Sequence, residues 1–342
     1  EFDRKISEKN IPFSATFELT YGCNLKCSMC YQFPFRKGEL NTQEVKGIID
    51  QLADAGCLYL SLTGGEPLMR KDIWDIVEHA RQRTFAVTLQ TNATLIGPAE
   101  ADTMRTLDVM DAHISVLGAT DSIHDKITGV AGSFRKAMRA AELLIARKIK
   151  VFFKTTVMKE NYSQYKDIWK LAESVGALPY FSPMIFPRSD GAGSPLRSRL
   201  SDDQLKELFS FVFSSDAEKI GLCTSHEPVA ICRMGRTECA INPRGDVYPC
   251  VSLPLTVGNL RKESFAEIWR SSAELKKIRA ISSADLKQCP ECSLAPDCLR
   301  CPGLSYLEHG DILSAPAECC RMAGTLQEVK AYEQEKIPET VH

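Results

Sequence analysis

Strand-like and helix-like segments alternate through the first half of this 342-residue chain. The clearest helical patterns cover residues 42–55, which end just before Gly56, and residues 133–147. Between the helical patterns, six segments predict strands, at residues 14–20, 58–63, 85–90, 112–117, 150–157 and 179–186. Such alternation is typical of parallel βα units. The predicted fold class is therefore α/β, a partial (β/α)6 barrel of the TIM type followed by a small, cysteine-rich domain dominated by loops.

Composition changes after the sixth predicted strand, where a loop rich in proline and glycine begins. Ten of the fourteen cysteines lie between Cys223 and Cys320, in sequence with little apolar periodicity. Metal clusters are therefore expected to hold this part together. The predicted organisation is a barrel at 1–190, a bridging segment at 191–220 with a helix at 201–213, a cysteine-rich domain at 221–326 and a polar tail at 327–342.

Charge and composition exclude several classes of protein. A net charge of −2 gives no electrostatic reason to expect nucleic acid or an anionic membrane surface as partner. No segment approaches the roughly 18 apolar residues of a membrane span, and the charged N-terminal residues do not resemble a signal peptide. We therefore expect a cytoplasmic protein with reduced thiols rather than a secreted protein held by disulfides.

Three cysteines follow the first predicted strand in the pattern C-x3-C-x2-C, as Cys23, Cys27 and Cys30. Soft thiolate ligands this close together suit three corners of a four-iron cluster and leave one iron open. The sequence Gly-Gly-Glu-Pro follows the next strand, at residues 64–67. Both motifs are thus predicted at the C-terminal ends of neighbouring parallel strands, where barrel enzymes carry their active sites. Half of a zinc site is the alternative for the cysteines alone.

Together these motifs resemble the radical S-adenosylmethionine (SAM) superfamily. The resemblance implies that the methionyl part of SAM chelates the open iron. It further implies that reduction cleaves SAM to a 5′-deoxyadenosyl radical, which abstracts hydrogen from a substrate. A flavodoxin- or ferredoxin-type protein is the electron donor that the resemblance implies.

The resemblance assigns seven residues to the SAM pocket: Met29, Gly64, Gly65, Glu66, Asn92, Ser115 and Lys154. The glycines let backbone approach the ligand, Glu66 or nearby carbonyls accept from its ammonium group, and the serine bonds its ribose or carboxylate. Met29 replaces an aromatic residue beside adenine, and Lys154 is placed to pair with the carboxylate. A hydrophobic loop residue and a solvated lysine are the alternatives for these two. Leu117 and Thr128 stand where the family often has an aspartate and an arginine.

The cysteine-rich part resembles the SPASM extension of radical SAM enzymes, except that its last short spacing has two residues rather than three. The resemblance implies one auxiliary cluster on Cys232, Cys239, Cys250 and Cys301. It implies a second auxiliary cluster on Cys289, Cys292, Cys298 and Cys319, which makes three [4Fe-4S] clusters in all. Cys319 is preferred to its neighbour Cys320, although the doublet leaves both open. A zinc ribbon is the alternative, and Cys57 and Cys223 are predicted to be buried thiols.

The resemblance implies a substrate class but identifies no catalytic acid or base. SPASM enzymes act mostly on ribosomally made peptides, which favours a peptide maturase that forms cross-links, epimers or oxidised residues, with a separate leader-peptide-binding protein as a possible partner. The alternative is an enzyme that acts on a tetrapyrrole or another small-molecule cofactor. The sulfatase-maturing type is disfavoured, because its proposed catalytic aspartate is Val251 here and cannot take a proton. A third hypothesis is an electron-transfer or scaffold protein without catalysis.

Overall fold

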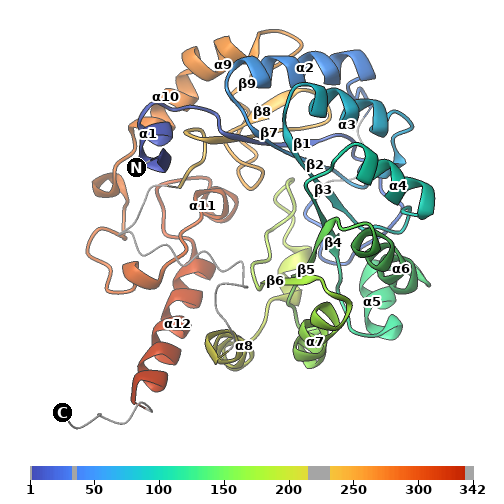
Figure 1. The fold of residues 1–342 in the computed structure, drawn as a ribbon. Coiled ribbons are helices and arrows are strands. Elements are labelled where there is room, and N and C mark those ends of the chain that lie inside the picture. The colour runs from blue at the N-terminus through green and yellow to red at the C-terminus, as the bar shows by residue number, and fades with distance from the viewer. Residues whose placement is uncertain (1, 33–36, 215–231, 336–342) are drawn as a thin grey trace, which may run out of the picture.

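A computed structural model describes residues 2–32, 37–214 and 232–335. Six parallel strands form the barrel in the order in which they occur along the chain, and this confirms the predicted α/β class (Figure 1). Their bounds are β1 (Ser14–Glu18), β2 (Tyr59–Thr63), β3 (Ala86–Thr91), β4 (Asp111–Ser115), β5 (Lys150–Thr156) and β6 (Leu178–Ser182). Each strand lies within four residues of its predicted limits at either end.

Helices cover the outer face of this sheet and are held to it by an apolar core. They are α2 (Thr42–Asp54), α3 (Ile73–Gln82), α4 (Pro98–Thr106), α6 (Ser133–Ala146) and α7 (Tyr165–Val175). Helix α1 (Phe2–Glu8) precedes β1, and α5 (Asp121–Thr128) precedes α6. Helix α2 begins at a capping box in which Asn41 and Glu44 satisfy each other's backbone amides. The strand residues that pack under the helices, such as Phe17 and Leu62, are fully buried.

The alternate residues of the same strands face the interior of the barrel, because successive side chains of a strand point to opposite faces. These positions are polar on β1, where Thr16 and Glu18 flank Phe17, and they stay polar at Gln90 on β3 and Lys154 on β5. The barrel interior is therefore lined by hydrogen-bonding groups rather than filled with apolar side chains.

Three strands from the cysteine-rich part continue the barrel sheet. Strand β7 (Glu238–Ile241) pairs in parallel with β1, and β8 (Asp246–Tyr248) and β9 (Gly258–Asn259) follow as antiparallel neighbours. The sheet order is β6-β5-β4-β3-β2-β1-β7-β8-β9. The cysteine-rich part thus shares a sheet with the barrel, a pairing that we did not predict, and the domain boundaries given above stay predictions.

The remaining helices follow the barrel strands in the sequence. They are α8 (Asp202–Ser214), α9 (Phe265–Ser271), α10 (Ala273–Ala280), α11 (Pro302–His309) and α12 (Ala317–Glu335), with short 3-10 turns at Pro67–Met69, Tyr162–Gln164, Ser194–Ser198, Ser283–Asp285 and Ala295–Asp297. Helix α8 matches the helix expected at 201–213. Helix α12 starts ten residues before the predicted tail and packs on α8, where Arg321 pairs with Asp202 at 2.7 Å. None of the helices in the described ranges is long and apolar enough to cross a membrane.

Candidate functional site

The cysteine loop leaves the C-terminal end of β1 and is held by hydrogen bonds to its own start. The Thr20 hydroxyl donates to Glu39, and the Gly22 amide donates to Thr20 Oγ1 at 3.0 Å. Cys23 and Cys30 are exposed on this loop, and Cys27 is partly buried. Burial, together with the nearby thiols of Cys30 and Cys23, raises the pKa of Cys27 to about 12. The three thiols therefore lie near one another at the mouth of the barrel, and their role as iron ligands stays a prediction.

Gly64 and Gly65 bring the loop after β2 against the cysteine loop. The Gly65 amide donates to the Thr20 carbonyl and the Glu66 amide to the Gly22 carbonyl, both at 2.8 Å. A Cβ on either glycine would lie inside van der Waals contact with the backbone oxygen of Thr20 or Gly22, and Gly64 also has a φ of +136°. We predicted that these glycines make room for the ligand. The close approach that the structure describes is to the backbone of the cysteine loop.

Glu66 is fully buried, and its carboxylate is hydrogen-bonded within the protein. It accepts from the Thr91 hydroxyl at 2.7 Å, the Asn92 amide at 2.8 Å and the Leu68 amide at 3.1 Å. Burial raises the pKa of this carboxyl. These hydrogen bonds join the ends of β2 and β3, and the contact of Glu66 with the SAM ammonium group stays a prediction.

Asn92 continues this connection to the cysteine loop. Its Nδ2 donates to Asn24 Oδ1 at 2.8 Å and lies 3.9 Å from the Cys23 sulfur. Hydrogen bonds to a ligating thiolate orient it and tune the potential of the cluster that it holds. Asn92 thus contacts a predicted iron ligand, while its contact with SAM stays a prediction.

The other residues predicted for the SAM pocket lie along the same end of the sheet. Met29 packs beside Cys27 in a small apolar group with Leu117 and Met158. Ser115 at the end of β4 is the register partner of Lys154 on β5. The Lys154 side chain lies inside the barrel rather than in solvent at its rim. Its Nζ donates to Gln90 Oε1 at 3.2 Å, and burial lowers its pKa. Direct contacts of these three residues with SAM stay predictions.

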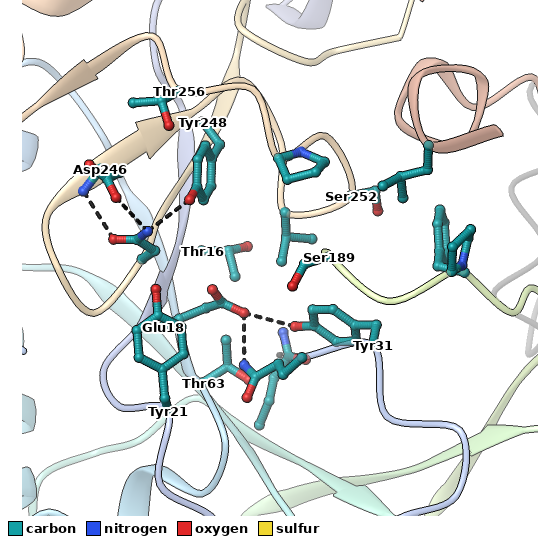
Figure 2. A pocket seen from close by; sticks show the side chains of 18 of the residues that line it. Thr16, Glu18, Tyr21, Tyr31, Thr63, Ser189, Asp246, Tyr248, Ser252 and Thr256 are labelled. Atoms are coloured by element: carbon teal, nitrogen blue, oxygen red, sulfur yellow. Dashed lines mark hydrogen bonds between the residues drawn. The ribbon is translucent and has the colours of Figure 1, made fainter. Parts of the chain in front are cut away.

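A cavity of about 450 Å³ opens between the inner faces of the barrel strands and the β7–β8 hairpin (Figure 2). Strands β1, β2, β3 and β5 contribute Thr16, Glu18, Thr63, Gln90 and Lys154. The opposite wall is mostly polar and is contributed by Asn242, Arg244, Asp246, Tyr248, Val251 and Ser252. Of the seven residues predicted for the SAM pocket, Lys154 lines this cavity.

Glu18 is the buried carboxylate of the cavity and was missed from the sequence. It accepts from the Tyr31 hydroxyl at 2.9 Å and from Gln32 Nε2 at 3.0 Å, both directly after Cys30 (Figure 2). Burial raises the pKa of Glu18. Its signal in the sequence was the polar residue at every second position of β1, which points into the barrel.

Asp246 is the second carboxylate of the cavity, and it has different surroundings. It accepts from Asn242 and Asn259, each at 2.8 Å, and pairs with Arg244 at 3.3 Å. Although partial burial opposes them, these partners together hold the pKa of Asp246 below its usual value. Tyr248 completes this wall and accepts from Asn242 at 2.8 Å.

The cysteines of the C-terminal part fall into two groups. Cys232, Cys250 and Cys301 form the first: burial raises the pKa of Cys250 to about 12, and the thiols of Cys232 and Cys301 add to the shift. The second group consists of Cys298 and three thiols near it: burial raises the pKa of Cys298, and the thiols of Cys320, Cys289 and Cys292 add to that shift.

Cys319 is the more deeply buried thiol of the doublet near the start of α12. It is 1% exposed, and apart from its burial, the thiols of Cys301 and Cys298 raise its pKa. Burial raises the pKa of Cys320, and the thiols of Cys289 and Cys292 add to that shift. Cys320, the neighbour that we did not prefer, is therefore close to Cys289 and Cys292, whereas Cys319 is close to Cys298 and Cys301. Cys57 is buried as predicted, whereas Cys223 lies outside the described residues.

In the part of the chain with described coordinates, no three ligand side chains converge as closely as a single metal ion requires. In a four-iron cluster each ligand binds a different iron, so its thiolates are spaced more widely than those around one ion. Groups of three or four thiols, which are soft donors, fit such clusters.

Two family models match the chain in sequence. The model described as the radical SAM superfamily matches residues 17–172, and the model described as an iron-sulfur cluster-binding domain, SPASM, matches residues 232–301. The first range runs from β1 into α7. The second contains β7–β9 and all the cysteines of the two groups except Cys320. The matches thus coincide with the two regions where the structure gathers cysteines.

Similar proteins include an AdoMet-dependent heme synthase of Methanosarcina barkeri, 30% identical over 93% of this chain and 99% of the relative. The mycofactocin maturase MftC of Mycobacterium tuberculosis is also 30% identical, over 87% of this chain and 79% of the relative. Among solved structures, Streptococcus suis SuiB bound to its precursor peptide SuiA superposes with a TM-score of 0.74 at 17% identity, covering 93% of this chain and 78% of that one. The chain is a radical SAM enzyme with a SPASM iron–sulfur domain.

Proposed function

We propose that this enzyme modifies a peptide, by cross-linking, epimerisation or oxidation, in the cavity between the barrel strands and the β7–β8 hairpin. The observation that carries the proposal is the lining of that cavity, which combines the carboxylates Glu18 and Asp246 with the cations Lys154 and Arg244. Peptides present donors and acceptors along their whole length, which a lining of both kinds satisfies. MftC and the SuiB complex with SuiA support a peptide substrate by similarity.

The SAM-binding cluster is proposed to sit on Cys23, Cys27 and Cys30. SAM bound to the open iron supplies, after reduction, the radical that takes hydrogen from the substrate. The chain's own residues position this chemistry: Glu66 and Asn92 fix the cysteine loop to the ends of β2 and β3. Among the remaining pocket residues, Lys154 and Ser115 are proposed for the SAM carboxylate or ribose, Met29 for the adenine, and Gly64 and Gly65 for the approach of backbone to the ligand.

Two auxiliary clusters are proposed for the C-terminal part, giving three [4Fe-4S] clusters in all. For the second, we propose Cys320 rather than Cys319 as the ligand that joins Cys289, Cys292 and Cys298. The proximity of the Cys320 thiol to Cys289 and Cys292, and the burial of Cys319, support this choice.

Glu18 is proposed as the group that takes a proton from the substrate. A general base is most effective when its pKa is close to the working pH, and burial moves the pKa of Glu18 in that direction. The pKa of Asp246 is lowered instead, which makes it the weaker base. Val251 lines the same cavity and has no ionisable group, so chemistry of the sulfatase-maturing type would lack its usual carboxylate there.

The proposed partners follow from this chemistry. A flavodoxin- or ferredoxin-type protein would reduce the SAM cluster, and a separate protein could present the leader part of the peptide. We propose a cytoplasmic location, where thiols stay reduced.

The second candidate is a tetrapyrrole substrate. The heme synthase of M. barkeri matches this chain over nearly the full length of both proteins, which favours this candidate. A tetrapyrrole that carries several carboxylates would need a surplus of cations, and the two cations of the cavity are balanced by two carboxylates. We therefore rank the peptide first.

The experiment that tests the proposal offers both substrate classes to the same enzyme. Reconstituted, dithionite-reduced enzyme is incubated with SAM and either synthetic peptides encoded by short reading frames beside its gene or an iron porphyrin with propionate side chains. We expect a mass change in a peptide, linked to formation of 5′-deoxyadenosine. A mass change confined to the porphyrin would overturn the peptide proposal and support the second candidate.

A further inference from the structure

Glu39, just before α2, contacts the start of the cysteine loop. Its Oε1 accepts from the Tyr21 amide at 2.7 Å and from the Thr20 hydroxyl at 3.1 Å. Thr20 in turn accepts from the Gly22 amide through Oγ1 at 3.0 Å. Hydrogen bonds to a carboxylate are stronger than those to a neutral acceptor. One side-chain oxygen therefore fixes the two residues that lead into Gly22 and the first cysteine of the loop.

Arg261, in the cysteine-rich part of the chain, holds the backbone of Glu39. Its guanidinium donates to the carbonyls of Gly38 at 2.8 Å and Glu39 at 3.1 Å. The same guanidinium makes a bidentate pair with Glu44 of α2, at 2.7 and 3.0 Å. Its own amide donates to Asn259 Oδ1, next to β9, at 3.0 Å. A planar guanidinium with this many partners has little freedom to turn, and lysine does not reproduce its geometry.

Leu40 is held from two further directions. Arg70 donates through Nη1 to the Leu40 carbonyl and to the Leu19 carbonyl at the end of the first strand, both at 3.0 Å. The Leu40 amide donates to the Pro243 carbonyl of the β7–β8 turn at 2.7 Å, and its side chain is buried in the main core. The Glu39 carboxylate therefore lies between fixed backbone groups on both sides, one set held from the barrel and one from the cysteine-rich part.

We propose that Glu39 is a positioning residue for the SAM-binding cluster and that Arg261 fixes Glu39 in the position that this requires. The inference rests on the cluster that the proposed function places on the cysteine loop. Glu39 acts through the backbone of Tyr21 and Gly22, which leads directly into Cys23. If this backbone shifts, the thiols and the iron that binds SAM shift with it, and misplacing reacting groups by about 1 Å can cost about 100-fold in rate. The cysteine-rich part thus contributes to SAM cleavage through one arginine.

The test uses reconstituted, dithionite-reduced enzyme without a peptide. It measures iron content, release of 5′-deoxyadenosine over a series of SAM concentrations, and the change that SAM induces in the electron paramagnetic resonance (EPR) spectrum. Auxiliary clusters whose irons all have protein ligands do not bind SAM, so this change reports on the SAM-binding cluster. Circular dichroism confirms that each variant is folded.

Glu39→Ala removes the oxygen that accepts from the loop. We expect release at saturating SAM to fall about 10- to 100-fold, with an altered SAM-induced EPR change. Glu39→Gln keeps an accepting oxygen and should stay within about twofold of the wild type. Glu267→Ala is the matched control, because Glu267 accepts from the amide and the hydroxyl of Ser264, at 2.9 and 2.7 Å, at the start of α9. This control should release 5′-deoxyadenosine normally.

Arg261→Ala leaves Glu39 in the chain and removes only its support. Arg261 lies on the surface, so the variant is expected to fold. We expect release to fall about tenfold, with the same kind of EPR change as in Glu39→Ala, and Arg261→Lys should not restore it. Arg147→Ala is the control: Arg147 pairs with Asp102 at 2.6 Å and donates to the Leu143 carbonyl at 3.0 Å, between the outer helices. Its EPR change and its release should match the wild type.

Three results would overturn the inference. Normal release and an unchanged EPR response in Glu39→Ala would remove Glu39 from SAM cleavage. Equal losses in Glu39→Gln and Glu39→Ala would show that the accepting oxygen is not what positions the loop. Normal behaviour of Arg261→Ala beside an impaired Glu39→Ala would remove the contribution of the cysteine-rich part. Failure of the proposed function is distinguishable, because the wild type itself would then contain iron, show no SAM-induced EPR change and release no 5′-deoxyadenosine.

Discussion

Single residues decide how the cysteine loop is held in place, and Gly65 is the clearest example. The backbone of this residue lies directly against Gly22, and its amide donates to Thr20. Sequence alone identified the glycines as important but assigned their lack of a side chain to ligand access. The partner was not predictable, because it is another loop that the fold brings within hydrogen-bonding distance.

Gly65→Ala is predicted to displace the cysteine loop. Its methyl group would overlap the Gly22 carbonyl, and overpacking against backbone costs on the order of 1–3 kcal/mol. We expect a lower urea midpoint and less iron after reconstitution. Gly47→Ala in α2 is the matched control, because a Cβ there meets nothing within 4 Å, and it should stabilise the helix by roughly 0.5–1 kcal/mol. Equal iron and equal midpoints for Gly65→Ala and wild type would refute this account of the loop.

At the scale of elements, local sequence patterns predicted the six barrel strands but not the three strands that continue their sheet. Period-two and helical patterns located all six barrel strands and helix α8, because each pattern is contained in one segment. The pairing of β7 with β1 joins segments more than 200 residues apart and leaves no local signal.

The junction between β4 and α5 contains a pH-sensitive contact. The buried His124 accepts from the Leu117 amide at 3.2 Å through Nδ1, and burial lowers its pKa from 6.5 to about 4. Between these values the folded chain binds fewer protons than the unfolded chain. The contribution of His124 to the free energy of unfolding is therefore complete above pH 6.5 and is lost as the pH falls toward 4.

We predict that the free energy of unfolding falls by on the order of 1–3 kcal/mol through this group between pH 7.5 and pH 4, at about 1.4 kcal/mol per unit of pKa difference. Urea titrations followed by circular dichroism at several pH values measure the loss. His124→Asn keeps an acceptor for the Leu117 amide and removes the titration, so its stability should depend less on pH. The same slope in both proteins would show that His124 does not contribute.

At the scale of the whole molecule, one sheet carries both cluster-binding regions (Figure 1). Arg261 beyond β9 pairs with Glu44 of α2 at 2.7 Å, and Trp269 of α9 donates to the Asn10 carbonyl at 2.6 Å. These contacts fix the β7–β9 hairpins and α9 to the barrel. The segment from Cys289 to Cys301 instead has no residue below 9% exposure, so its order depends most on the proposed clusters.

Removal of iron is therefore predicted to loosen the molecule unevenly. After treatment with ferricyanide and a chelator, amide hydrogen exchange should rise strongly in peptides from 286–301 and little in peptides from β2 and β3. The barrel peptides serve as the internal control, because their protection comes from the sheet and its apolar core. A uniform rise across both regions would contradict this division of stabilising forces.

The most direct test of the central claim is release of 5′-deoxyadenosine by reconstituted enzyme that has been reduced with dithionite and supplied with SAM. The claim is that Cys23, Cys27 and Cys30 hold a cluster whose open iron binds SAM. We predict release of 5′-deoxyadenosine by the wild type and at least a 100-fold loss, on the order of 3 kcal/mol in barrier, in Cys27→Ala. Cys57→Ala, which removes a buried thiol outside the loop, should release it normally. Undiminished release by Cys27→Ala, or none by wild type with full iron content, would contradict the claim.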